Sequence, residues 1–129
     1  MKKSFTTTVL LVGMLAAVAA QAPTPFKRTV LQQADLSAPG REVVMALAEI
    51  QPGAASGRHT HPGEEIAYVS AGPIVLEIDG KPARTLQTGE AFIIPAGTVH
   101  NARNAGTALA KVVATYVIEK GKPVATPVQ

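Results

Sequence analysis

Short apolar runs separated by turn-forming residues dominate the chain after position 40. The runs cover residues 43–50, 66–69, 74–78, 91–94 and 108–118. The turns between them are Pro52-Gly53, Pro62-Gly63, Gly72-Pro73, Asp79-Gly80, Pro95-Ala96-Gly97 and Asn104-Ala105-Gly106. Short strands at regular spacing with such turns are typical of a β-sandwich or a β-barrel. We therefore predict one all-β domain, with no long segment of helical period beyond the first 20 residues.

The dipeptide Asp79-Gly80 gives the clearest hairpin signal in the chain. It lies between the apolar run 75–78 and the segment 81–86. Both central positions of a type I′ turn require a positive φ, which Asp-Gly accepts. The sequence therefore predicts a type I′ hairpin here.

Strand parity predicts which side chains face the interior, because alternate residues of a strand point to opposite faces. Tyr68 lies out of phase with Glu65, so we expect Tyr68 to face outward. Phe92 and Ile94 share one face, and either they or their immediate neighbours look into the barrel. Glu64 is out of phase with Glu65 and is expected to be solvated.

Composition agrees with a single folded domain. The chain has 129 residues, of which 47% are hydrophobic and 16% charged. This length is close to the common size of one domain, and such a composition is that of a folded chain. Only 4% of the residues are aromatic, so the core is expected to be mainly aliphatic.

The N-terminus reads as a secretory signal peptide. Lys2 and Lys3 precede an apolar run at 9–20, and small residues follow it. A membrane span needs about 20 apolar residues, so an uncleaved anchor is the weaker interpretation. Cleavage after Ala20 fits the small-residue rule, and cleavage after Ala19 is the alternative. We predict a periplasmic or secreted protein with no stable membrane anchor after cleavage.

Charge and cysteine content exclude several classes of function. Removal of residues 1–20 takes away two of the twelve basic residues and leaves ten against nine acidic residues, a net charge of +1. No basic cluster then remains to indicate nucleic-acid binding. The chain has no cysteine, which excludes disulfides, a thiolate metal site and a cysteine nucleophile.

The three histidines of the chain are its candidate metal-binding residues. His59 and His61 lie two residues apart, so a strand would place both rings on one face. Glu65 follows across the Pro62-Gly63 turn, and His100 follows a second turn. Imidazole nitrogen and a carboxylate suit divalent transition metals. From spacing alone, a metal site and two surface histidines on a strand both remain open.

Two longer segments carry a family resemblance. Residues 53–72, GAASGRHTHPGEEIAYVSAG, and residues 89–104, GEAFIIPAGTVHNARN, resemble the two motifs of the cupin superfamily. The matched positions are Gly53, His59, His61, Glu65, Gly72, Gly89, Pro95, Gly97, His100 and Asn104. The short stretch between the motifs is similar to that of small single-domain bacterial cupins.

The resemblance implies an antiparallel jelly-roll β-barrel, preceded here by the cleavable signal peptide. It implies that His59, His61, Glu65 and His100 bind a divalent transition metal, which is Fe, Mn, Ni, Zn or Cu. The glycines and Pro95 are expected to shape turns, and Asn104 to bond backbone. Arg58 and Arg103 are expected to be solvated rather than to contact a substrate.

Three functions follow from the resemblance as hypotheses. The first is a metalloenzyme of dioxygenase type, acting on a small enol- or diketone-like substrate, with Glu65 as ligand and catalytic base. The second is a redox-neutral isomerase or decarboxylase. The third is a non-catalytic periplasmic protein that binds a small molecule. An aliphatic interior offers few stacking surfaces for a large flavonoid.

The predicted organisation has four parts. Residues 1–20 form the signal peptide, 21–40 an N-terminal arm, 41–119 the cupin barrel and 120–129 a C-terminal tail. Within the arm, 29–33 is either a short strand or part of an extended segment. Pro123 and Pro127 predict that the tail is loose. By resemblance, pairing through an outer strand and the arm predicts a homodimer.

Overall fold

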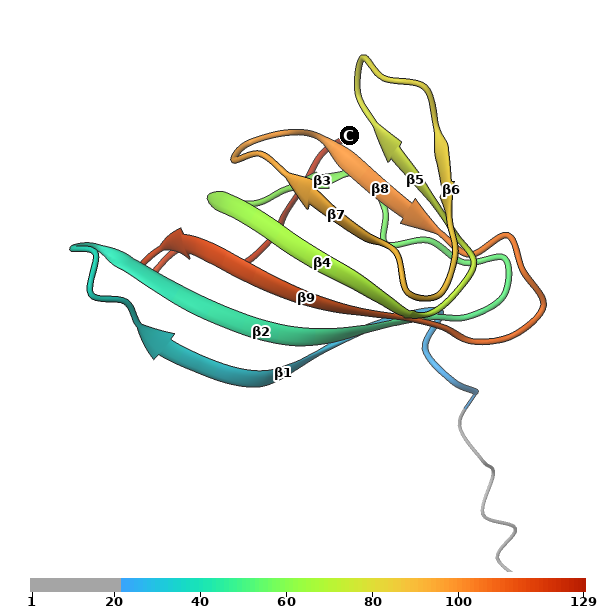
Figure 1. Cartoon of the computed structure of the whole chain (residues 1–129), viewed down its shortest axis with the longest axis horizontal. Coiled ribbons are helices and arrows are strands. Elements are labelled where there is room, and N and C mark those ends of the chain that lie inside the picture. Colours follow the sequence, from blue (N-terminus) through green and yellow to red (C-terminus); the bar gives the residue numbers. More distant parts are fainter. Residues whose placement is uncertain (1–21) are drawn as a thin grey trace, which may run out of the picture.

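The computed structural model describes residues 22–129, which fold into two antiparallel five-stranded sheets packed face to face (Figure 1). The first sheet has the order β1-β2-β9-β4-β7 and the second β10-β3-β8-β5-β6. The strands are β1 (Phe26–Asp35), β2 (Arg41–Ile50), β3 (His59–Thr60), β4 (Gly63–Ala71), β5 (Ile74–Ile78), β6 (Arg84–Leu86), β7 (Ala91–Ile94), β8 (His100–Arg103), β9 (Ala110–Glu119) and β10 (Thr126–Pro127). The prediction of an all-β antiparallel fold is confirmed. The predicted signal peptide lies outside the described residues.

Alternation along the long strands builds the core between the two sheets. On β4, Glu65, Ala67 and Val69 are buried, whereas Glu64 and Tyr68 are exposed. On β7, it is Phe92 and Ile94 that face the interior. The parity predictions for Tyr68 and Glu64 are confirmed. The core is mainly aliphatic, as the low aromatic content predicts.

The hairpin at Asp79-Gly80 exists, but the predicted turn type is wrong. Gly80 has a φ of 77°, and no residue other than glycine has a positive φ among those described, so Asp79 does not fit type I′. The ladder between β5 and β6 begins only at Leu76 and Arg84. Pro82 lacks an N–H group and cannot extend the ladder toward the turn, which lengthens the loop.

Both ends of the described chain join the sheets. The segment 29–33 is strand, because β1 pairs along β2 as an edge strand. The C-terminal residues are not loose: β10 pairs with β3, and the Val128 N–H donates to the Arg58 carbonyl at 2.9 Å. Figure 1 shows the C-terminus beside β3 and β8. Within residues 22–129, no helix has the length and apolar character that a membrane crossing requires.

Candidate metal centre

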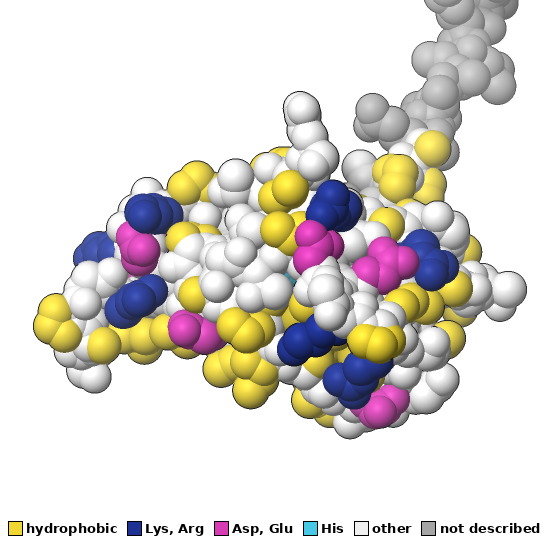
Figure 2. Space-filling model, turned by 90° about the horizontal axis from the view of Figure 1, so that it is seen from above, with side chains coloured by type: hydrophobic (Ala, Val, Ile, Leu, Met, Phe, Trp, Pro, Cys, Tyr) yellow, Lys and Arg dark blue, Asp and Glu magenta, His cyan; other side chains and the backbone are white. Residues whose placement is uncertain are grey.

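Strand pairing brings the four predicted ligand residues together between the sheets. His59 on β3 is the register partner of His100, the first residue of β8. His61 lies in the short connection from β3 to β4, and Glu65 projects inward from β4 of the other sheet. All four residues are buried, with exposed fractions of 3 to 6%. Accordingly, Figure 2 shows hardly any histidine surface on the face it presents, where acidic and basic side chains are interspersed.

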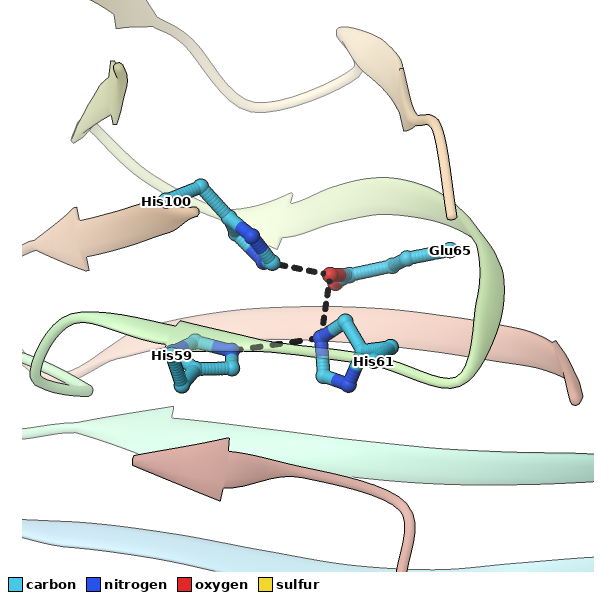
Figure 3. A group of neighbouring side chains, drawn as sticks. All are labelled: His59, His61, Glu65 and His100. Atoms are coloured by element: carbon cyan, nitrogen blue, oxygen red, sulfur yellow. Dashed lines mark hydrogen bonds and ion pairs between the residues drawn. The ribbon is translucent and has the colours of Figure 1, made fainter. Parts of the chain in front are cut away.

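The polar atoms of these side chains converge on one point (Figure 3). The Glu65 Oε2 lies 3.0 Å from the His61 Nε2 and 2.9 Å from the His100 Nε2. The His59 Nε2 lies 3.2 Å from the His61 Nε2. One ligand atom of each residue lies within 4.8 Å of all the others. In a metal site with bonds of about 2.1 Å, ligand atoms on opposite sides of the ion lie about 4.2 Å apart. The longest distances between the ligand atoms of this cluster would therefore need to shorten by only about half an ångström to hold a cation.

Backbone carbonyls orient all three imidazoles. The Nδ1 of His59 donates to the Gly57 carbonyl at 2.7 Å, and that of His100 to the Thr98 carbonyl at 2.9 Å. Each of these acceptors lies two residues before its histidine. The His61 Nδ1 donates to the Val124 carbonyl at 2.5 Å. With the proton fixed on Nδ1, each ring turns its Nε2 toward the cluster, which is how metal-binding histidines are held.

The protonation states of His59 and Glu65 also suit a cation. Burial above all, together with the neighbouring His100 and His61, lowers the pKa of His59 to about 4 against the opposing hydrogen bond to Gly57. Burial alone would raise the pKa of Glu65, but the polar and charge interactions with His100 and His61 together outweigh it and lower this pKa to about 2. Near neutral pH the His59 ring is therefore neutral and the Glu65 carboxylate ionised, the forms that bind metals.

Without metal, the protein is expected to lose stability in two steps as the pH falls. The folded pKa of His59, about 4, lies below its unfolded value of 6.5, so the unfolded chain binds the extra proton between these pH values. Glu65 acts in the same direction between pH 4.5 and about 2. Each step lowers the free energy of unfolding by up to about 1.4 kcal/mol per pH unit.

Urea midpoints of chelator-treated protein between pH 8 and pH 3 measure this effect. The His59→Gln variant should lack the upper step and keep the lower one. Identical profiles for the variant and the parent chain would contradict the assignment to His59.

A small cavity adjoins the cluster. Its walls include His59, Glu65 and His100 together with aliphatic side chains and the rings of Phe92 and Tyr116. Its volume of about 20 Å³ holds roughly one water molecule. The Tyr116 ring packs 4.5 Å from the His61 ring. Burial and the Glu65 carboxylate raise the pKa of the Tyr116 hydroxyl to about 12, so it stays protonated. The narrow, largely aliphatic interior favours small ligands over large flat ones.

The other residues named from the sequence make structural hydrogen bonds or surface ion pairs. The Asn104 side chain donates to the Ile50 and Ala108 carbonyls, both at 2.8 Å, as predicted for a turn residue. Arg58 and Arg103 are close to half exposed, and carboxylates on the surface pair with them, so the prediction that they are solvated is confirmed. Sequence reasoning missed two residues at the site, because neither lies near a histidine in the chain: Val124, whose carbonyl accepts from His61, and Arg28, which lines the cavity and donates to the Tyr116 hydroxyl.

An antiparallel two-sheet barrel with three histidines and one glutamate converging between its sheets defines a β-barrel protein with a candidate metal centre. Comparison with known families identifies it further. The model of the cupin domain matches residues 46–116, more than half of the sequence. The chain belongs to the cupin family.

Relatives and solved structures agree with this family. The transcriptional regulator PuuR of Escherichia coli is 33% identical over 79 residues, which are 60% of this chain and 42% of the regulator. A Klebsiella pneumoniae protein with a double-stranded β-helix domain has a TM-score of 0.67 at 19% identity, over 83% of this chain and 90% of that chain. An oxalate oxidase in complex with the substrate analogue glycolate has a TM-score of 0.66 at 26% identity, over 83% of this chain and 57% of the oxidase chain. The chain thus spans less than half of the regulator and little more than half of the oxidase.

Proposed function

We propose that this chain is a divalent-metal-dependent enzyme of dioxygenase type that acts on a small enol- or diketone-like substrate. The observation that carries the proposal is the buried cluster of His59, His61, Glu65 and His100 opening on a cavity. An ion that takes six ligands would keep two positions for other ligands beside these four residues, unlike a closed structural site. The resemblance to an oxalate oxidase that binds glycolate supports a small oxygen-bearing ligand.

The bound ion, whether Fe, Mn, Ni, Zn or Cu, would polarise substrate oxygens and, if redox-active, bind O₂. The residues of the chain supply the surroundings. The aliphatic wall excludes bulk water, and the three backbone carbonyls hold the imidazoles in place. Glu65 is ionised, and its pKa of about 2 makes it a good cation ligand but a weak proton acceptor near neutral pH. Its catalytic role stays a prediction.

One observation favours a second candidate function. The similarity to PuuR, a regulator, is consistent with a cupin that captures a small molecule without transforming it. Such a protein would use the same cluster as a ligand-binding site. The two candidates differ in turnover, which can be measured directly.

The test is elemental analysis of the purified protein, followed by O₂ uptake with a panel of small enols and diketones. We expect about one metal ion per chain and O₂ consumption matched by loss of substrate. Substrate loss without O₂ consumption would indicate the redox-neutral isomerase or decarboxylase. Metal and ligand binding without turnover would indicate the binding protein, and absence of metal would contradict all three.

We further propose that the protein is exported and forms a homodimer. The six large exposed hydrophobic side chains of residues 22–129 all lie on β1, β2, β4 and β7 of one sheet: Val30, Leu31, Met45, Ile66, Tyr68 and Ile93. Ile66 and Ile93 are direct cross-strand partners. Four of the six, Met45, Ile66, Tyr68 and Ile93, alternate with buried residues and so share the outer face of the sheet. An apolar sheet face of this kind is typical of a protein–protein contact.

Native mass spectrometry of protein expressed with its leader tests both parts. The expected species is a dimer of chains that lack residues 1–20. A monomer at micromolar concentration would contradict the pairing, and a subunit mass that includes the leader would contradict export.

A further inference from the structure

Arg28 lies where two hollows of the molecule meet. Its side chain lines the inner cavity beside the histidine–glutamate cluster and also an outer pocket. The outer pocket is larger, about 250 Å³, and its wall includes Gly57, Ala125 and Pro127. Arg28, Ser56 and His59 line both hollows. A molecule that moves from the outer pocket toward the cluster therefore passes the Arg28 guanidinium.

Aromatic rings hold this guanidinium. The Arg28 Cζ lies 5.3 Å from the centre of the Phe26 ring and 5.6 Å from that of Tyr116. The Arg28 Nε donates to the Tyr116 hydroxyl at 3.2 Å. Contacts of this kind fix the plane of an arginine side chain before a ligand arrives, which reduces the entropy lost on binding.

Arg28 has no acidic partner among residues 22–129. Its neighbour at the outer pocket, Arg58, pairs with Asp79 at 2.6 Å. Arg103, elsewhere on the surface, pairs with Glu77 at 3.4 Å. The one hydrogen bond of the Arg28 side chain within the same residues uses Nε. The two terminal nitrogens are left for an acceptor, and a guanidinium presents them in a geometry that suits a carboxylate.

The charges of the site favour an anionic ligand. With a divalent cation on neutral imidazoles, the Glu65 carboxylate and the Arg28 guanidinium, the net charge at the centre would be +2. The surrounding wall is largely apolar, so this charge is weakly screened. A small anion bound in the outer pocket, which Arg28 and His59 also line, would neutralise part of it.

We propose that Arg28 is the specificity-determining residue of this site, and that its ligand is a small oxo- or hydroxy-carboxylate. The carboxylate pairs with the Arg28 guanidinium, and the second oxygen of the ligand faces the histidine–glutamate cluster. This inference rests on the proposed function for the metal, but the contact with Arg28 does not require the ion. The inference narrows the proposed substrates to those that carry a negatively charged carboxylate.

The test compares small acids with their uncharged esters. Pyruvate and acetoacetate, and the methyl ester of each, are titrated calorimetrically into metal-loaded and chelator-treated protein, with metal content measured on the same samples. In the parent chain the acids should bind more tightly than the esters. Arg28→Gln should weaken binding of the acids by about 10- to 100-fold, the usual effect of losing charge-assisted hydrogen bonds, and leave the esters unchanged.

Two further variants control the experiment. Arg58→Gln removes a positive charge from the outer pocket that Asp79 already pairs with, and it should change binding of the acids by less than about threefold. Arg28→Lys keeps the charge without the planar fork and should bind the acids with intermediate affinity; it carries the test if Arg28→Gln does not fold.

Either of two results would overturn the inference: no preference for acids over esters at millimolar concentration, or equal affinity of the parent chain and Arg28→Gln for the acids. A protein that holds no metal but loses acid binding in Arg28→Gln would contradict the proposed function and support this inference. A protein that holds metal but binds the acids equally well with Arg28→Gln would contradict this inference and leave the proposed metal site standing.

Discussion

Glu65→Gln is expected to purify without stoichiometric metal. The substitution removes the carboxylate from the cluster but keeps the size of the side chain. The new amide group can still donate hydrogen bonds to the Nε2 atoms of His61 and His100 that face Glu65. The fold should therefore survive while the negative charge that opposes the cation is lost. Loss of residues that only support metal ligands costs about 10- to 100-fold in affinity, so loss of a ligand should cost more than about 100-fold.

The neighbouring residue supplies a matched control. Glu64 is exposed on the opposite face of β4, so Glu64→Gln removes the same charge one position away. It should retain metal at the level of the parent chain. Elemental analysis and competition with a chelating dye measure both variants, and the rise in melting temperature on adding metal should disappear only in Glu65→Gln. Stoichiometric metal in both variants would remove Glu65 from the site.

The fold class and the four residues of the cluster were predicted from the sequence on different grounds. Local rules predicted the strands and their faces, whereas the resemblance to the two cupin motifs implied the four residues of the cluster. Period-two alternation put Glu65 on the inner face of β4 and Tyr68 on the outer face, as the structure shows. The three histidines lie in two short segments with distinctive turns, so their pattern could be matched without knowing how the strands pair.

Contacts that depend on distant parts of the chain could not be predicted. The Val124 carbonyl orients His61 from 63 positions away, and the tail that carries it looked loose because of its prolines. The contact of Arg28 with Tyr116 spans 88 positions. Such contacts depend on the strand order of each sheet, and no local pattern of residues encodes that order. Gly63 belongs to the same group: its sequence context indicates a turn, but the structure gives it a second role in packing.

Gly63→Ala is expected to destabilise the protein severely. Gly63 is the first residue of β4, between His61 and Glu65, and it pairs with Ile118 on β9. A Cβ atom at this position would lie 1.9 Å from the Val117 carbonyl oxygen and 2.7 Å from the Ile118 Cα. These are backbone atoms of a central strand, so no side chain can turn aside to make room. We expect a loss of more than about 3 kcal/mol, beyond the usual cost of an overpacked core.

Thermal unfolding of the metal-free variant measures this loss, which should lower the melting temperature by at least about 10 °C. Gly57→Ala is the control. Gly57 has a φ of 79°, with no atom within 4 Å of an added Cβ, so an alanine there meets only backbone strain of about 1–2 kcal/mol. A Gly63→Ala variant at least as stable as Gly57→Ala would contradict the close approach of β4 to β9. Because this approach fixes the strand that carries Glu65 beside the loop that carries His61, any Gly63→Ala protein that folds should also bind metal more weakly than Gly57→Ala.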